Sequence, residues 1–255
     1  MRNVWIIFRK ELRSYFVSPV AYLLLAMFAV IFGFFFWNIL GFMVNRGIES
    51  MMHGQMFPMN VNEEVLRPLL SNIGVIGLFL IPMITMRLFA EEKRTGTIEL
   101  LATSPISDVQ VILGKWLAAV ALYGGMLLLG AINFLWIFKY SQPDWKPLAI
   151  GYLGLLLQAG ALLAVGTFIS TLTKNQIIAG AVTFAVCLLL WVLEWVSGFE
   201  TATWARVVSY MSVITHFESF AKGLLDLKDA IFYVTLIFLG LFLTSRSMES
   251  LRWRS

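Results

Sequence analysis

The chain has 255 residues, of which 59% are hydrophobic and only 13% are charged, and its formal net charge is +4. An ordinary soluble domain has roughly 45–50% apolar and about 25% charged residues, so the composition excludes a soluble protein. The basic residues lie beside long apolar runs, where they orient spans and meet lipid headgroups. The charge therefore does not indicate nucleic-acid binding, and the sequence predicts an all-α polytopic membrane protein.

The first 19 residues predict an amphipathic helix that lies on the inner leaflet. Its rings and aliphatic side chains recur at helical spacing, and cations fill the rest of the helix. Such a helix places rings at the acyl boundary and cations beside lipid phosphates; a helix bound to a soluble partner is the alternative. The interfacial residues are predicted to be Trp5, Phe8, Arg9, Lys10 and Leu12. Ser18-Pro19 then supplies a cap and a first-turn proline that turn the chain into the bilayer.

Six apolar runs predict six transmembrane helices within a single domain. They cover about residues 20–44, 69–86, 116–138, 148–172, 176–196 and 230–244. The last run is short, because a span needs ~20 residues. If the N-terminus is inside, the segments on that side hold 12 of the 19 lysines and arginines. This bias predicts that both termini are cytoplasmic.

The stretch 87–108 is the most charged continuous segment. It contains a helix break at Gly96, a short amphipathic turn, a stop at Pro105 and a new helix start at Ser107, which Gln110 completes as a capping box. We interpret it as a rigid coupling helix that docks on a soluble partner and offers Glu99 to a basic residue there. An interfacial loop with self-compensating charges is the alternative.

Two outer segments are further candidates. The stretch 197–229 is apolar but too interrupted to span, so we predict short helices that dip into the outer leaflet, with an ordinary outer loop as the alternative. Methionines and one histidine cluster in and beside the loop 45–67, a set that suits Cu(I) but also serves as an adaptable contact surface. The clustered residues are Met43, Met51, Met52, His53, Met56 and Met59.

The sequence contains no phosphate-binding loop, since Gly114-Lys115-Trp116 lacks the upstream glycine and the following serine or threonine. It also contains no zinc-protease or nucleophile-elbow motif. We therefore predict a non-enzymatic chain that binds no cofactor or metal itself. Any use of ATP requires a separate subunit.

Three segments carry a family resemblance. Residues 91–107, EEKRTGTIELLATSPIS, followed by Gly114-Lys115, resemble the E-x-x-x-G-T-x-E-x-L-x-x-x-P-[IV]-S…G-K pattern of ABC-2-type transporter permeases. The opening FRKELRSYF with Ser18-Pro19 is similar to the start of that family, and THFESFAKGLLDLKD at 215–229 resembles its outer segment before the last span. Together they resemble the gliding-motility-type (GldF-like) branch, akin to NosY-like permeases.

The resemblance implies an assembly of two permease subunits, identical or different, with two cytosolic ATPases that hold the ATP and magnesium. It also implies six spans, an N-terminal elbow helix (1–19), a coupling helix (91–105) and re-entrant outer helices (197–229). The residues expected to contact the ATPase are Glu91, Gly96, Thr97, Ile98, Glu99, Leu100, Leu101, Thr103 and Pro105. Those expected in the outer region are His216, Phe217, Phe220 and Gly223.

The resemblance therefore implies a permease of the bacterial inner membrane, and we expect it to export or extract an amphipathic or polymeric substrate. Membrane lipids and periplasmic or accessory membrane proteins are further expected partners. Two alternatives stay open: a membrane anchor that recruits a cytosolic assembly without transport, and a copper-handling permease that uses the methionine-rich loop.

Overall fold

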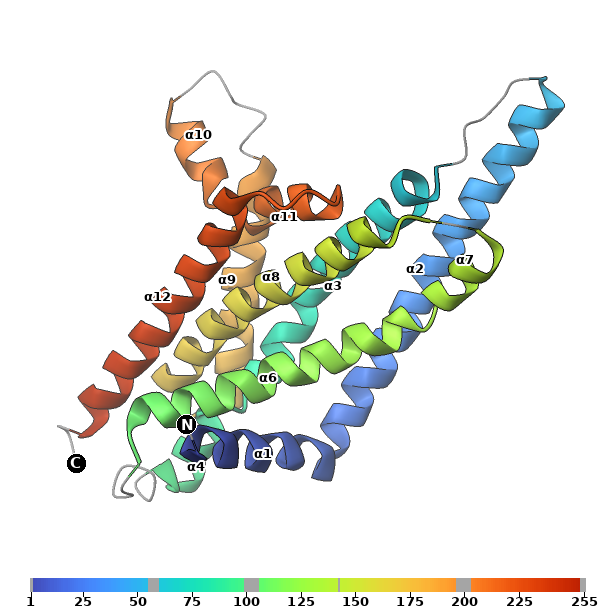
Figure 1. Cartoon of the computed structure of the whole chain (residues 1–255). Coiled ribbons are helices and arrows are strands. Elements are labelled where there is room, and N and C mark those ends of the chain that lie inside the picture. Colours follow the sequence, from blue (N-terminus) through green and yellow to red (C-terminus); the bar gives the residue numbers. More distant parts are fainter. Residues whose placement is uncertain (1, 55–59, 99–105, 142, 196–202, 253–255) are drawn as a thin grey trace.

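The structure is a computed structural model that describes residues 2–54, 60–98, 106–141, 143–195 and 203–252. Within these ranges every regular element is a helix. The helices form one elongated bundle, in which both marked termini lie at the same end (Figure 1). We call this the α1 end, after α1 (Arg2–Val17), and the opposite end the α11 end, after α11 (Val213–Ala221).

Six helices in the described residues are long and apolar enough to cross a membrane, which confirms the predicted fold class. The first is α2 (Pro19–Met52), and the second combines η1 (Asn62–Leu66), α3 (Arg67–Thr85) and α4 (Ala90–Thr95). The third combines α6 (Asp108–Ala131) with α7 (Phe134–Tyr140). The others are α8 (Trp145–Leu172), α9 (Gln176–Val192) and α12 (Leu227–Arg252).

Several predicted bounds differ from the observed ones. The last helix, α12, has 26 residues rather than about 15, because the polar residues after Thr244 continue it. The helix that contains the first predicted span, 20–44, continues to Met52, so α2 measures about 51 Å at 1.5 Å per residue. The helix start predicted at Ser107 is confirmed, since α6 begins at Asp108 with Ser107 at its N-cap position, but a turn between α6 and α7 interrupts the run predicted as continuous over 116–138.

The prediction of a capping box at Ser107 was wrong. Ser107 does occupy the N-cap position of α6, but its side chain makes no cap hydrogen bond. The carbonyl oxygen of the Gln110 side chain instead accepts a hydrogen bond from Asn3 of α1 at 3.1 Å. A contact with a distant helix has therefore replaced the local one.

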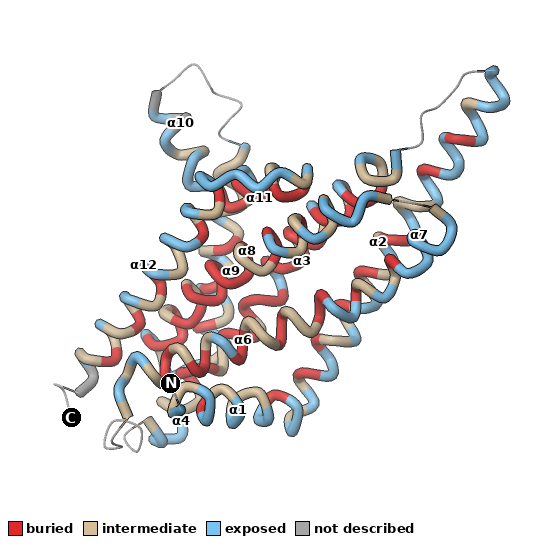
Figure 2. The backbone as a smooth tube through the Cα atoms, viewed as in Figure 1, coloured by how far each residue is buried: buried red, intermediate tan, exposed pale blue. Residues whose placement is uncertain are grey.

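Helix α8 lies at the centre of the bundle and packs against α3, α6, α9, α11 and α12. Buried residues concentrate along α8, α3 and α6, whereas α2 and α12 are largely exposed on one face (Figure 2). Small residues permit the close contacts: a Cβ on Gly240 of α12 would lie 2.8 Å from the backbone carbon of Ala164. Association through small residues is common where lipid, rather than water, surrounds the helices.

Helix α1 lies across the bundle at a steep angle to the spans (Figure 1). Ser18 alone separates it from α2, whose first residue is Pro19, and the Ser18 hydroxyl accepts a hydrogen bond from the backbone N–H of Val20. Helix α1 packs on α6, where Ile7 fills the space left by Gly114. At the other end, α11 lies across α8, α3 and α12 beside α10 (Thr203–Tyr210).

Candidate functional site

The charged segment after α3 forms a compact structure at the α1 end. A turn leads from α3 into α4, which carries Glu91 and Glu92 in its first turn and Lys93 and Arg94 in its last. This order complements the helix dipole. Gly96 ends the helix with φ = 74°, a left-handed conformation that glycine adopts without strain.

Helix α8 holds α4 in place. The backbone N–H groups of Phe89 and Ala90 both donate to the hydroxyl of Ser170, each at 3.1 Å. The ammonium of Lys93 donates to the carbonyl of Thr171. Because the first N–H groups of a helix have no partner within it, Ser170 acts as the cap that α4 does not supply itself. The last turn of a central spanning helix thus determines where α4 lies.

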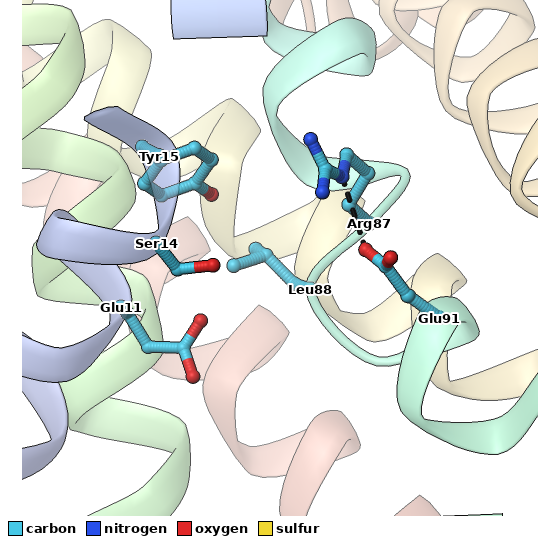
Figure 3. Close-up of a pocket in the computed structure, with 6 residues that line it drawn as sticks. All are labelled: Glu11, Ser14, Tyr15, Arg87, Leu88 and Glu91. Atoms are coloured by element: carbon cyan, nitrogen blue, oxygen red, sulfur yellow. Dashed lines mark hydrogen bonds and ion pairs between the residues drawn. The ribbon is translucent and has the colours of Figure 1, made fainter. Parts of the chain in front are cut away.

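Arg87 connects the same segment to α1 and α2. Its guanidinium donates to Glu91 at 3.0 Å and to the hydroxyl of Ser18 at 3.1 Å. It borders a cavity of about 40 Å³ that Figure 3 shows between α1 and the turn after α3. The lining residues are Glu11, Ser14, Tyr15, Arg87, Leu88 and Glu91.

Tyr15 closes the cavity on the α1 side. Its hydroxyl donates to the carbonyl of Ile84 at 3.3 Å. Burial raises the pKa of the Tyr15 phenol well above its usual value, and the nearby Glu11 raises it further, while Arg87 acts in the opposite direction. The phenol therefore stays neutral and keeps the proton that it donates to α3.

Lys115 is the central ion of this end. Its side chain is only 3% exposed, and its ammonium lies 3.1 Å from Glu11 of α1 and 2.9 Å from Glu92 of α4. It also lies 5.2 Å from the centre of the Phe89 ring. One lysine on α6 thus joins three helices, and the two carboxylates compensate a charge that burial alone would strongly disfavour. We call Lys115, Glu11 and Glu92 the lysine cluster.

Residues 43–244, most of the chain, match the family described as "ABC-2 family transporter protein". This chain belongs to the ABC-2 transporter family. It is similar to the "Probable multidrug ABC transporter permease YbhR" of Escherichia coli strain K12 and of Escherichia coli O157:H7, with 29% identity over 171 residues. That match covers 65% of this chain and 44% of each relative, so the chain spans less than half the length of the relatives.

An ABC-2 permease is a transmembrane subunit without catalytic residues of its own. In this ABC-2 permease, four of the nine residues predicted to contact an ATPase are described, namely Glu91, Gly96, Thr97 and Ile98. Glu91 pairs with Arg87, and the hydroxyls of Thr95 and Thr97 lie 3.0 Å apart beside the end of α4. The other five lie outside the described residues: Glu99, Leu100, Leu101, Thr103 and Pro105.

The predicted interfacial residues lie along α1 of the permease. Trp5 is 63% exposed and stacks on Phe8 with ring centres 5.0 Å apart, Arg9 and Lys10 are exposed, and Leu12 is half-buried. The only acidic residue of this helix, Glu11, turns inward to Lys115. Apart from Ser14, the exposed side chains of α1 are therefore cationic or apolar.

The predicted outer residues lie together at the α11 end. Phe217 and Phe220 pack against Gly154 of α8, where a Cβ would lie 2.4 Å from Phe220. Gly223 has φ = 76° and lies against Pro147. His216 is buried.

The methionine-rich region is divided in the structure. Met43 is buried, whereas Met51 and Met52 are about four-fifths exposed at the end of α2. Met56 and Met59 lie outside the described residues. Among the residues that the structure describes, no group of three histidine, cysteine, aspartate or glutamate side chains is placed to hold a metal.

Sequence reasoning missed the lysine cluster. In the sequence, Lys115 stands out only as part of a motif, and Glu11 only as part of the opening segment. A lone lysine within the first turns of an apolar helix was the available signal, because a charge at such a position needs a partner. The partners lie 104 and 23 positions away, and no local pattern identifies them.

Replacing Ser170 by alanine is expected to loosen α4 while leaving the spans intact. Two buried backbone donors, at Phe89 and Ala90, would lose their shared acceptor, at a cost of about 1–3 kcal/mol. Amide hydrogen exchange in α4 should accelerate. The matched control is Ser250→Ala on α12, because Ser250 is exposed and its hydroxyl donates to a carbonyl of its own helix, that of Ser247. Equal exchange in the two variants would contradict the role assigned to Ser170.

Proposed function

We propose that this permease pairs with a separate cytosolic ATPase that docks on the α1 end, around α4 and the segment 91–105. The lysine cluster is the observation that carries this proposal. A docking element transmits force only if it is fixed to the spans, and Lys115, Ser170 and Arg87 fix α4 to α6, α8 and α2. A free interfacial loop has no need of such attachments.

The proposed orientation places the α1 end in the cytoplasm of a bacterium and the α11 end outside its inner membrane. The excess of lysine and arginine in the segments of the α1 end supports it. So does the outward face of α1, with exposed Trp5 and Phe16 beside Arg9 and Arg13, which suits the headgroup region of an anionic leaflet. Both termini are then cytoplasmic.

The proposed assembly contains two permease subunits, identical or different, and two ATPase subunits that bind the ATP and magnesium. Its proposed substrate is an amphipathic or polymeric molecule moved outward or extracted from the membrane. The name of the Escherichia coli relatives, a probable multidrug permease, supports an amphipathic substrate. Placement in the gliding-motility-type or NosY-like branch rests on the motif resemblance alone.

The docking proposal is tested by reversing a charge on the proposed contact segment. With Glu99→Lys, we expect the ATPase to co-purify at a yield reduced by about tenfold, which corresponds to the loss of one charge-assisted contact. The matched control is Glu49→Lys, the same charge change at the exposed far end of α2. Measurements are co-purification of the ATPase and ATP hydrolysis in reconstituted vesicles.

Two outcomes would contradict the proposal. Unchanged co-purification and coupling in Glu99→Lys and in Glu91→Lys would exclude docking at this segment. Vesicles that hydrolyse ATP but move no substrate across a broad panel would instead favour a membrane anchor that recruits an ATPase without transport.

A further inference from the structure

Gln158 places an amide in the middle of the bundle. Its side chain is 2% exposed, and within the residues that the structure describes neither Oε1 nor Nε2 has a hydrogen-bond partner. Gln158 lies half-way along α8, about 20 Å from either end at 1.5 Å per residue. The amide is therefore near the centre of the apolar layer, where an unpaired polar group is most unfavourable.

The ring of Phe217 fills the space beside this amide. A Cβ on Gly74 of α3 would lie 3.1 Å from Oε1 and 3.6 Å from Nε2 of Gln158, and 3.6 Å from Cδ1 of Phe217. On α8, a Cβ on Gly154 would lie 3.1 Å from Cε2 of the same ring, and Gly154 is one helical turn before Gln158. The ring thus lies between α3 and α8 next to the amide, to which it offers no oxygen or nitrogen partner.

Polar contacts attach α11 to α12. Nδ1 of the buried His216 lies 2.7 Å from Oδ1 of Asp229, and the hydroxyl of Tyr233 donates to the carbonyl of Val213 at 2.7 Å. Toward α3 and α8, the same helix presents the ring of Phe217. Because an apolar contact is non-directional, this ring can move away from α3 while the attachments to α12 stay intact.

Movement of the ring would let the amide bond to water. A glutamine amide has one acceptor oxygen and two donor hydrogens, and a water molecule can serve either kind of group. The ring of a phenylalanine takes up far more space than one water molecule needs. The hydrogen bonds that the amide of Gln158 gains would then offset part of the apolar contact that Phe217 loses.

We propose that the amide of Gln158 is a water-binding site that the ring of Phe217 covers. When the ring moves off, a water molecule binds the amide and lowers the free-energy cost of moving α11 away from α3 and α8. Opening at the α11 end thus brings water to the middle of an otherwise apolar bundle. The inference rests on the packing around Gln158 alone, and it holds whether or not an ATPase docks at the α1 end.

The first test removes the amide at nearly constant volume. In Gln158→Met, an unpaired polar group gives way to an apolar chain of similar size, so the full chain in nanodiscs of phosphatidylethanolamine and phosphatidylglycerol should unfold about 2–4 °C higher. Gln110→Met is the matched control: Gln110 accepts a hydrogen bond from Asn3 at 3.1 Å, so the same substitution should not raise the unfolding temperature. A Gln158→Met protein that unfolds no higher than the unmodified protein shows an amide that is already satisfied, and it overturns the proposal.

A double-mutant cycle measures the coupling between the amide and its cover. Phe217→Ala removes the ring and admits water, so the variant should lose less thermal stability when residue 158 is glutamine than when it is methionine. The same cycle with the milder Phe217→Leu serves if the alanine variant does not fold. Phe32→Ala on α2 is the control, because Phe32 is buried against Gly130 of α6, and its cost should not depend on residue 158.

Solid-state NMR detects the water directly, through transfer of proton polarisation from water to the side-chain nitrogen of Gln158. Its signal is identified as the one that Gln158→Met lacks. We expect almost no transfer in the unmodified protein and clear transfer in the Phe217 variants. Equal costs of the Phe217 substitutions in the two backgrounds overturn the proposal, as does the absence of transfer in those variants or equally strong transfer with the ring in place.

Discussion

Replacing Lys115 by methionine is expected to destabilise the α1 end more than any other single removal of charge there. The substitution leaves the carboxylates of Glu11 and Glu92, each about 15% exposed, without their common partner. Removing one member of a buried ion pair costs about 3–5 kcal/mol, because the other charge stays buried. Thermal unfolding of the reconstituted chain should show the loss, and hydrogen exchange should place it in α1 and α4.

Lys10→Met provides the matched control. Lys10 is also a lysine near Glu11, at 3.8 Å, but its side chain is 68% exposed. An exposed pair of this kind contributes little, so the control should unfold like the unmodified protein. If the two variants have the same thermal stability, the lysine cluster does not hold the helices together.

Neutralising Glu11 and Glu92 should restore the stability that is lost in Lys115→Met. In Lys115→Met with Glu11→Gln and Glu92→Gln, no unpaired charge remains, and replacement of a whole buried ionic group is often nearly neutral. We expect most of the lost stability to return. ATPase coupling should not return with it if the ionic contacts transmit movement from α4 to α6, so the triple variant separates stability from coupling.

The sequence predicted the membrane spans better than their ends. Apolar length alone identifies six spans, because a hydrocarbon core admits few other structures. It does not show where a helix stops outside the bilayer. The residues after Thr244 and after Val44 are polar enough to read as loops, but they continue α12 and α2 as helices, since water tolerates a polar helix and the preceding turns nucleate it.

The two polar clusters were predictable only in part. His216 stood in a segment singled out by its resemblance, yet its pairing with Asp229, 13 positions later, depends on how α11 turns back over α12. The pairing of Lys115 likewise depends on how two other helices, α1 and α4, pack against α6. Hydropathy and helix caps are local properties of a chain, whereas these pairs follow from packing, so the sequence indicates that a charge needs a partner without showing which one.

Helix α8 connects the two ends physically. Ser170 near its last turn caps α4, and Gly154 near its first turns receives Phe217 and Phe220 of α11. The two contacts lie 16 residues apart on one continuous helix. A displacement of α4 that moves α8 along its axis would therefore also displace α11. Movement at the proposed docking site would thus be transmitted through α8 to the α11 end.

The contact between α8 and α12 leaves no room for added volume at Gly240. Gly240→Val is expected to separate the two helices, because even a Cβ at this position would lie 2.8–3.0 Å from the backbone carbon, Cβ and carbonyl oxygen of Ala164. Backbone atoms cannot rotate away as a side chain can, so we expect a cost near 3 kcal/mol, at the top of the range for overpacking. Gly125→Val on α6 is the matched control, since a Cβ there meets nothing within 4 Å, and it isolates the intrinsic effect of valine in a helix. Thermal unfolding of the two variants measures the difference, and a Gly240→Val protein as stable as Gly125→Val would show that α12 is free to move away from α8 without loss.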